Sequence, residues 1–432
     1  MARPPVPPFL WGVSTSAYQI EGAVATDGRG PSIWDTFAHE PGRIVTGETG
    51  DVACDHYHRY AEDVALMAGL GVNAYRFSVA WSRVQPAGAG RVNARGLDFY
   101  RRLVDELLAA GIAPVLTLYH WDLPQPLQDE GGWLNRDTAG RFAEYAGIVA
   151  DALGDRVALW VTLNEPFVHM VYGYAYGTHA PGQTLLFDAL PTAHHQLLGH
   201  GLAVAALRAR TAAPITLANN YSPVVVRGET DADRAAGDAY DALHNRLFTD
   251  PLLGRGYPDG FDLPVQDGDL EAIAAPIDAI GVNYYNPTGI RAPSTPDSPL
   301  PFDTVELDGY PLTDFGWPVV PGGLREILTR LHRDYALPLY VTESGCAYAE
   351  TPDDQRRIDY LASHIDALRA AIDDGADVRG YFVWSLMDNF EWAEGTSKRF
   401  GLVHVDFDTL VRTPRASYAW LRDQIASARE AS

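Results

Sequence analysis

The sequence predicts a single (β/α)8 barrel, a TIM barrel, that spans residues 1–432. Eight apolar runs of strand length occur along the chain, and amphipathic helical stretches lie between most of them. Eight β–α alternations in one chain are typical of a closed parallel barrel. The first run is followed by "GVSTSAYQIEG", which lacks the glycine-rich phosphate turn that an open doubly wound sheet usually carries.

The eight candidate strands are short runs rich in β-branched and aromatic residues. They cover residues 10–14, 72–79, 113–119, 157–163, 215–219, 279–284, 339–342 and 380–385. The chain is long enough for eight repeats, because α/β barrels of more than ~400 residues fold as one unit. Its 47% content of hydrophobic residues supplies a large core.

Glycine marks the ends of several helical stretches, as expected for the residue that follows a helix. Gly71 and Gly111 come just before the second and third candidate strands. The stretch 137–154 begins with Asp137, a predicted helix N-cap. The proline-rich segment 286–323 is predicted to be irregular and, because it follows the sixth strand, to lie over the barrel mouth.

The charge and the cysteine content limit the class of protein. The chain carries 33 basic and 56 acidic residues, a net charge of −23, so neither a nucleic acid nor an anionic membrane is expected as a partner. The first residues, "MARPPVPPFLWG", lack the apolar stretch of a secretory signal, and no apolar run approaches the ~20 residues that span a membrane. A cytoplasmic protein is therefore expected. The two cysteines, Cys54 and Cys346, allow at most one disulfide.

Two of the candidate strands end in a glutamate. "LWVTLNEP" carries Glu165 and "LPLYVTESG" carries Glu343. Pro166 predicts an extended backbone at Glu165, with its side chain delivered at the C-terminal end of the strand. Strands four and seven lie on opposite sides of a barrel, so the two glutamates are expected to face each other. Paired carboxylates are the chemistry of glycoside cleavage.

Polar and aromatic side chains occur at the other strand ends, where the active site of such a barrel lies. They are Gln19, Arg76, His120, Trp121, Asn164, Asn219, Asn220, Tyr221, Asn283, Tyr284, Tyr285, Trp384, Glu391 and Trp392. Amide groups suit the hydroxyls of a sugar, and aromatic rings suit its apolar faces. The sequence therefore predicts one carbohydrate pocket at these ends.

Other readings of these residues are weaker. A single glutamate at a strand end is more often a surface or ion-paired residue, but two at barrel strand ends fit that reading less well. The histidine groups His56/His58 and His194/His195/His200 lie on predicted outer helices, so no metal and no cofactor are expected. Cys346 lies close to Glu343, but without a histidine signature a catalytic thiol is not expected.

Several longer motifs point to one family. They are "FLWGVSTSAYQIEGA", "YHWDLPQPL", "TLNEP", "GVNYY", "VTESG", "WSLMDNFEW" and "GLVHVDFDTLVRTPRASY". In them the chain resembles glycoside hydrolase family 1, the β-glucosidase family, over essentially its whole length. One such motif is weak evidence, but the set together is highly specific.

The resemblance implies a role for each site residue. Glu165 matches the acid/base, and Glu343 matches the nucleophile that forms a covalent glycosyl-enzyme. The residues implied to bind substrate are Gln19, His120, Trp121, Asn164, Asn283, Tyr285, Trp317 on the aglycone side, Trp384 as the stacking floor, Glu391 and Trp392. Arg76 and Tyr285 would support the nucleophile, and the peptide bond between Trp384 and Ser385 would be cis.

The resemblance also implies an activity. It is retaining hydrolysis of unphosphorylated β-D-glucosides from the non-reducing end. The expected partner is a small-molecule or oligosaccharide β-glycoside substrate, and the expected biological process is cellulose degradation. β-Galactosides and β-fucosides stay open as substrates, as do a transglycosidase that uses the same intermediate and an inactive carbohydrate-binding protein. The sequence leaves the oligomeric state open.

A few residues depart from the family pattern or separate its branches. Ser344 stands where the family usually has Asn, and Phe167 stands where Trp is frequent. Glu391 replaces the Ser of the branch that cleaves 6-phospho-β-glycosides. Lys398 matches a phosphate-gripping Lys, but Phe400 lacks the hydroxyl of the matching Tyr.

Overall fold

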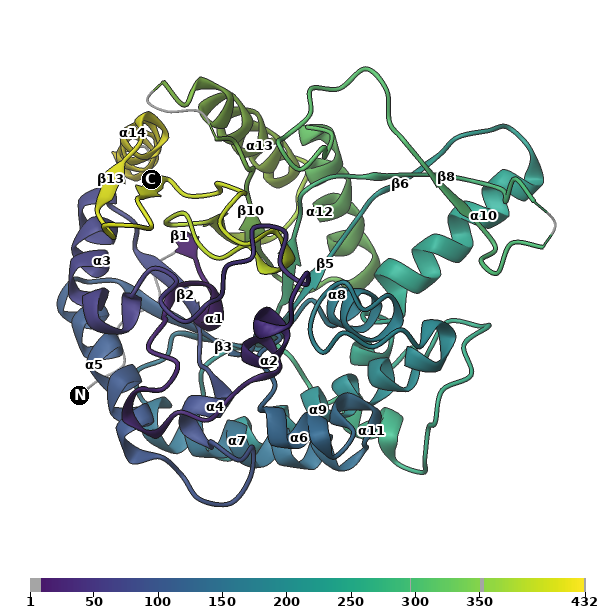
Figure 1. Cartoon of the computed structure of the whole chain (residues 1–432). Helices are drawn as coiled ribbons and strands as arrows, with labels where there is room; N and C mark the ends of the chain where they lie inside the picture. The colour runs from purple at the N-terminus through teal and green to yellow at the C-terminus, as the bar shows by residue number, and fades with distance from the viewer. Residues whose placement is uncertain (1–8, 296, 350–352, 431–432) are drawn as a thin grey trace.

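A closed barrel of parallel strands forms the centre of the molecule, seen in the computed structural model of residues 9–295, 297–349 and 353–430 (Figure 1). The order around the barrel is β1-β11-β10-β7-β5-β4-β3-β2. Pairing of Leu10 with Gly380 and of Gly12 with Ala74 joins β1 to its two neighbours and closes the ring. The predicted (β/α)8 barrel is confirmed. The N-terminal residues 1–8, used above for the missing secretory signal, lie outside the described residues.

The barrel strands follow the predicted runs closely. They are β1 (Leu10–Ser14), β2 (Ala74–Ser78), β3 (Ala113–Tyr119), β4 (Leu159–Asn164), β5 (Ile215–Asn220), β7 (Ile280–Asn283), β10 (Leu339–Ser344) and β11 (Val378–Trp384). β10 continues past its predicted end, so Glu343 lies inside the strand and pairs in register with Asn283. β4 stops at Asn164, so Glu165 is the first residue beyond its strand.

The long helices surround the barrel on its outside, and several short helices lie toward the middle of the view (Figure 1). The α-helices of both kinds are given in chain order. They are α1 (Ala17–Ile20), α2 (Ile33–His39), α3 (His56–Leu70), α4 (Trp81–Val84), α5 (Ala94–Ala109), α6 (Gln125–Asp129), α7 (Asp137–Leu153), α8 (Pro166–Val168), α9 (Pro191–Arg208), α10 (Asp231–Asp241), α11 (Asp269–Ile273), α12 (Pro321–Tyr335), α13 (Gln355–Asp373) and α14 (Ala416–Glu430). Gly71 caps α3 with a φ of 81°, a conformation that glycine adopts without steric cost. Asp137 is the first helical residue of α7 rather than its N-cap, which is Arg136. That correction is small, because an acidic side chain in the first turn still faces the positive end of the helix dipole.

Two layers of apolar side chains hold the barrel together. Small and large buried residues from the strands, among them Ala74, Val115, Val161, Ala218 and Phe382, form a cluster of their own. A second and larger cluster packs the strands against the surrounding helices. Rigid strands held from both sides keep their C-terminal ends at fixed positions.

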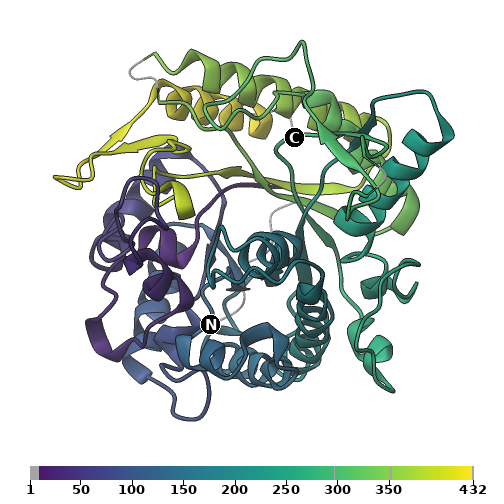
Figure 2. The same cartoon turned by 45° about the vertical axis from the view of Figure 1, so that its right-hand side comes forward.

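Short sheets lie outside the barrel. β6 (Val224–Val226), β8 (Thr288–Arg291) and β9 (Asp303–Val305) form one, and β12 (Val403–Val405) pairs with β13 (Arg412–Pro414) in another. The second pair is the yellow hairpin at the left of Figure 2. The segment 286–323 is therefore not fully irregular, because β8 and β9 lie within it. A strand pairing as short as four residues carries too little pattern to be read from sequence.

The described helices include none that is long and apolar enough to cross a membrane. Cys54 and Cys346 are both free and buried, so the disulfide that the sequence allowed does not form.

Candidate active site

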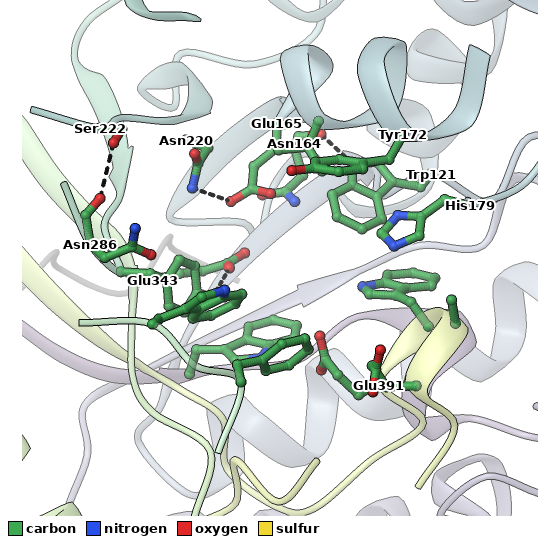
Figure 3. Close-up of a pocket in the computed structure, with 18 of the residues that line it drawn as sticks. Trp121, Asn164, Glu165, Tyr172, His179, Asn220, Ser222, Asn286, Glu343 and Glu391 are labelled. Atoms are coloured by element: carbon green, nitrogen blue, oxygen red, sulfur yellow. Dashed lines mark hydrogen bonds between the residues drawn. The ribbon is translucent and has the colours of Figure 1, made fainter. Parts of the chain in front are cut away.

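A cavity of about 360 Å³ opens at the C-terminal ends of the barrel strands. Glu165, Glu343 and Glu391 all line it, and Figure 3 shows them around one hollow. Aromatic rings make up much of the rest of the wall, among them Trp121, Trp317, Trp384 and Trp392. A pocket of this size, with a few charged groups among rings, fits a small sugar.

Glu343 lies between a cation and a hydroxyl. Arg76 Nη1 donates to one carboxylate oxygen over 2.6 Å, and the Tyr285 hydroxyl donates to the other over 2.7 Å. Both oxygens of the buried carboxylate are thereby held in place. The chain turns sharply just beyond, at Gly345, where a Cβ atom would lie 1.8 Å from the carbonyl oxygen of Trp384. Only glycine allows β10 to pass so close to β11 at this point.

Glu165 follows β4 in a left-handed conformation, with φ 45° and ψ 59°. The extended backbone expected from Pro166 is therefore wrong. Pro166 is the first residue of α8, and Glu165 is the N-cap residue that turns the chain from strand into helix. A left-handed residue other than glycine costs about 1–2 kcal/mol, and such residues cluster at functional sites. Trp121 and Trp392 in the same pocket also have positive φ, at 73° and 50°.

Burial and the negative charge of Glu343 together raise the pKa of Glu165 to about 8. Arg76 and the amides of Asn283 and Asn220 oppose this shift. The Asn283 amide donates to Glu165 Oε1 over 2.8 Å, and the Asn220 amide donates to the same oxygen over 3.4 Å. Glu165 is thus protonated at neutral pH beside a carboxylate that is paired with arginine.

This protonation gives a pH prediction. A proton donor acts only while it holds its proton, so we expect kcat/KM for a poor leaving group to fall as the pH rises through about 8. Measuring kcat/KM for an alkyl β-glucoside from pH 3 to pH 10 checks this expectation. An alkaline limb near the ordinary pKa of a glutamate, about 4.3, would contradict it.

Asn164 connects the groups that hold the two glutamates, Arg76 and Asn283, with His120 on the cavity wall. Its side-chain oxygen accepts from Arg76 Nη2 over 2.7 Å and from the Asn283 amide over 3.0 Å. Its amide lies 3.0 Å from Nε2 of His120. Burial and the charge of Arg76 hold the pKa of His120 well below its usual range, so this imidazole is neutral. Trp121 donates from its indole nitrogen to the Asn164 carbonyl.

Gln19 and Glu391 are in contact: Glu391 lines the cavity, whereas Gln19 is fully buried and is not among the lining residues. The Gln19 amide donates to Glu391 Oε2 over 3.2 Å and to Asn389 over 3.0 Å. Burial raises the pKa of Glu391 to about 8, and Glu343 adds to the shift. The peptide bond between Trp384 and Ser385 is cis, as the resemblance implied.

Trp317 stands on the outer wall of the cavity. Its ring lies 5.2 Å from that of Tyr285 and stacks on Phe315 at 4.4 Å. Lys398 is not itself among the residues that line the cavity. Its ammonium donates to the Asp314 carbonyl oxygen over 2.9 Å and lies against two lining residues, over the Phe315 ring and 3.7 Å from Glu394.

Some strand-end residues do not join the pocket. Asn219 donates to the carbonyl of Phe248, and the hydroxyl of Tyr221 bonds with Thr249. The Tyr284 hydroxyl likewise donates to a carbonyl of the outer helix layer. These three residues were expected in the pocket, but successive side chains of a strand point to opposite faces. Asn220 and Tyr285, one position on, face inward instead.

Other pocket residues were missed by the sequence reasoning. They are Val168, Tyr172, His179, Ser222, Tyr240, His244, Asn286, Thr288, Phe315, Ala393 and Glu394. They come from loops, from α8 and α10, from the π-helical segments η3 (His169–Ala175) and η5 (Ala242–Arg246), from β8 and from the 3-10 turn η7 (Trp392–Glu394). No strand-end signal marks them, because their place depends on how the loops fold back over the barrel.

Among the described residues, no group of three or more His, Cys, Asp or Glu side chains could hold a metal ion. Three of the five histidines considered above pair with carboxylates: His56 with Asp63 at 2.7 Å, His58 with Asp55 at 2.6 Å and His194 with Asp269 at 2.8 Å. His195 bonds with the Trp133 carbonyl, and His200 bonds with the Thr162 hydroxyl.

Two buried glutamates in one barrel pocket, one protonated and one paired with arginine, define a glycosidase. The chain belongs to glycosyl hydrolase family 1, whose family model matches residues 5–430.

Known relatives cover nearly all of the chain. It is 49% identical to "Thermostable beta-glucosidase B" of Thermobispora bispora, over 96% of this chain and 89% of the relative. It is 46% identical to "Bifunctional beta-D-glucosidase/beta-D-fucosidase" of Bifidobacterium breve, over 97% of both chains. The solved structure "Beta-glucosidase from Thermotoga maritima in complex with glucoimidazole" is 43% identical, with a TM-score of 0.94 over 97% of this chain and 98% of that chain.

Proposed function

We propose that this protein is a retaining β-D-glucosidase that releases one glucose from the non-reducing end of unphosphorylated β-glucosides. The observation that carries the proposal is the contrast between the two glutamates. Glu165 holds a proton because of burial and of the neighbouring charge, whereas Glu343 lies against the guanidinium of Arg76. These are the states that an acid and a nucleophile need at the start of the reaction.

In the first step, a Glu343 oxygen attacks the anomeric carbon. The bond between that carbon and the glycosidic oxygen breaks, and the proton of Glu165 moves to the departing oxygen. The product is a glycosyl ester on Glu343 and a free alcohol. Tyr285 and Arg76 hold the attacking carboxylate in one orientation before the step begins.

In the second step, water attacks the anomeric carbon and Glu165 accepts the proton of that water. The ester bond breaks and Glu343 returns as a carboxylate. Glu165 can serve as the base now, because the negative charge of Glu343 that raised its pKa is absent from the ester. Two displacements at one carbon leave the sugar in its original β configuration.

For the sugar, we propose the binding roles that the resemblance implied. Gln19, His120, Asn164 and Glu391 bond the hydroxyls, as their mutual contacts on the inner wall of the cavity allow. Trp384 forms the floor. Trp121, Trp317 and Trp392 complete the walls, with Trp317 nearest the aglycone, and Asn283 acts from just behind the wall, where its amide donates to Glu165.

The test is hydrolysis of an aryl β-glucoside followed by proton NMR of the first glucose formed. The expected product is β-glucose, which mutarotates later to the mixture of anomers. α-Glucose as first product would refute retention. Assays with the matched aryl β-galactoside and β-fucoside measure which sugars the enzyme accepts. The fucoside is included because one relative is described as a bifunctional β-D-glucosidase/β-D-fucosidase.

Two other activities are distinguished by the same assay. An acceptor alcohol can replace water in the second step, and the ratio of transfer product to free glucose measures this transglycosidase activity. An inactive carbohydrate-binding protein would bind glucose without turnover. The presence of both glutamates in the cavity argues against that reading.

Phosphorylated substrates should be poor. The described residues that line the cavity include Glu165, Glu343 and Glu391 but no Lys or Arg, and Lys398 is engaged with Asp314 and Phe315. A 6-phosphate would enter beside the Glu343 charge without a cation of its own, at a cost of several kcal/mol. We expect kcat/KM for an aryl 6-phospho-β-glucoside to be at least about 10²-fold below that for the plain glucoside. A preference for the phosphate would overturn this assignment.

We further propose that the chain works as a single catalytic domain of residues 1–432, in the cytoplasm, on short β-linked glucose oligomers such as those formed in cellulose degradation. Its two buried free thiols fit a reducing compartment. Aromatic side chains at the outer wall, Tyr172 and Trp317, offer faces for a second sugar. Hydrolysis of cellobiose and cell fractionation test these points.

A further inference from the structure

A chain of hydrogen-bonding groups leads from Glu165 into the outer wall of the pocket. Asn220 lies between two partners: its amide nitrogen is 3.4 Å from Glu165 Oε1, and its oxygen is 2.9 Å from His244 Nε2. The other ring nitrogen of His244 lies 2.9 Å from the Tyr240 hydroxyl. Figure 3 shows the Asn220 amide turned toward Glu165. None of these side chains except Glu165 takes part in the reaction steps above.

His244 is fixed in place by its surroundings. It belongs to the π-helical segment η5, is 7% exposed, and packs against the ring of Phe167 with centroids 4.0 Å apart. Phe167 stands where the family often has Trp, so the contact between Phe167 and His244 involves one of the positions at which this chain departs from the family pattern. Burial lowers the pKa of His244 to about 4, with Asp241 opposing the shift. The ring is therefore neutral at the pH at which the enzyme acts.

A neutral imidazole carries one N–H, and the positions of its neighbours decide where the proton lies. Glu165 in its ionised form needs a donor, so the nitrogen of the Asn220 amide faces it. The Asn220 oxygen then faces His244 and needs a donor as well, which places the proton on Nε2. Nδ1 is left as an acceptor for the Tyr240 hydroxyl, 2.9 Å away. That hydroxyl also points its single proton toward Thr288 Oγ1, 3.1 Å away, so Nδ1 and Thr288 share one donor.

We propose that His244 is a positioning residue for the acid/base: through its Nε2–H it holds the Asn220 amide with the nitrogen toward Glu165. The proposal rests on the proposed function of Glu165. Without this hold, the amide can rotate and present its oxygen to the carboxylate, which removes a donor from the ionised form. His244 thereby helps Glu165 return to the carboxylate state that the second step requires.

The direction of the effect follows from the groups that face Glu165. The charged groups are the Glu343 carboxylate on β10 and the Arg76 guanidinium on β2. The others are the Glu391 carboxyl group beyond β11, the neutral imidazole of His120, and the neutral phenols of Tyr285 and Tyr172. None of them changes when His244 is replaced. Loss of the Asn220 donor alone should raise the pKa of Glu165.

The experiment is the pH profile of kcat/KM for an alkyl β-glucoside. In His244→Phe, we expect the alkaline limb to move upward by about 0.5–1 pH unit, because one hydrogen bond to the ionised form is lost. In His244→Gln, whose amide nitrogen can take the place of Nε2, the limb should return to its wild-type position. Tyr240→Phe, which keeps the ring and removes only the hydroxyl, should shift the limb in the same direction as His244→Phe.

A double variant separates positioning from a merely structural role. In Asn220→Ala the donor is already absent, so adding His244→Phe should not move the limb further. An alkaline limb that stays at the wild-type pH in both His244→Phe and Tyr240→Phe would overturn the proposal, as would a further shift in the double variant. Circular dichroism and the thermal midpoint report whether each variant folds. If His244→Phe does not fold, the pH profile of Tyr240→Phe decides whether the proposal holds.

Failure of the proposed function gives a different result. A wild-type protein that hydrolyses no β-glycoside would refute the glycosidase assignment itself. A wild-type enzyme with normal activity and unshifted variants would refute only the role of His244.

Discussion

Replacing Glu343 by glycine should abolish hydrolysis of every β-glucoside, with kcat falling by about 10⁴–10⁶-fold. The nucleophile forms the bond to the anomeric carbon, and among the described residues of the cavity no other carboxylate is placed between an arginine and a phenol as Glu343 is. Arg76 would be left in a buried site without its anion, so stability should also fall. Steady-state assays with an aryl β-glucoside, together with thermal unfolding, measure both effects.

A small anion offers a sharp control for this prediction. Azide or formate can enter the space left by the Glu343 side chain beside Arg76 and attack the anomeric carbon in its place. The product with azide would be the α-glucosyl azide, since only one displacement occurs. Glu326→Gln on the exposed face of α12 serves as the matched change of charge and should leave kcat unaltered. Residual turnover within tenfold of wild type in Glu343→Gly would show that another residue is the nucleophile.

Replacing Glu165 by alanine should affect substrates according to their leaving group. The alkyl group of an alkyl β-glucoside departs as a strongly basic alkoxide unless its oxygen is protonated, so kcat/KM for this substrate should fall by about 10²–10⁴-fold. The dinitrophenolate of a dinitrophenyl β-glucoside departs without protonation, so kcat/KM for that substrate should change much less. The second step then lacks its base, and the glycosyl-enzyme should accumulate and give a burst of phenol.

The control for this prediction is Glu165→Gln, which keeps the shape and the contacts with Asn283 and Asn220 but carries no transferable acid proton. It should show the same dependence on the leaving group as Glu165→Ala. An equal loss on alkyl and dinitrophenyl substrates in both variants would exclude Glu165 as the acid. The alkaline limb near pH 8 should also disappear from the residual activity, because that limb is assigned to Glu165.

The two glutamates illustrate how one pocket sets two protonation states. Both side chains are buried, at 5% and 3% exposed, so desolvation acts on each. The difference is the partner: Glu343 has a guanidinium at 2.6 Å, whereas the groups within hydrogen-bond distance of Glu165 are neutral amides. Arg76 lies on β2 and Glu343 lies on β10, and β1 and β11 lie between these two strands in the ring. Closure of the barrel, in which β1 pairs with both β2 and β11, therefore brings Arg76 to Glu343.

The sequence by itself determined the barrel and the two glutamates. The strands could be predicted within a few residues, because buried parallel strands are continuous apolar runs and the helices between them have a different period. Glu165 and Glu343 could be predicted because a barrel directs the C-terminal ends of its strands to one place. That rule needs only the order of elements along the chain, which the sequence contains.

The tertiary structure alone decided the finer arrangement. The sequence did not reveal that Asn219 and Tyr221 point away from the pocket, nor that Glu165 takes a left-handed backbone. It also did not reveal His244 or Tyr240, which reach the cavity from η5 and from the end of α10, outside the barrel strands. Their positions, and the pKa of Glu165, depend on distances between residues far apart in the chain. Such distances arise from packing of the whole molecule, and no local pattern of residues records them.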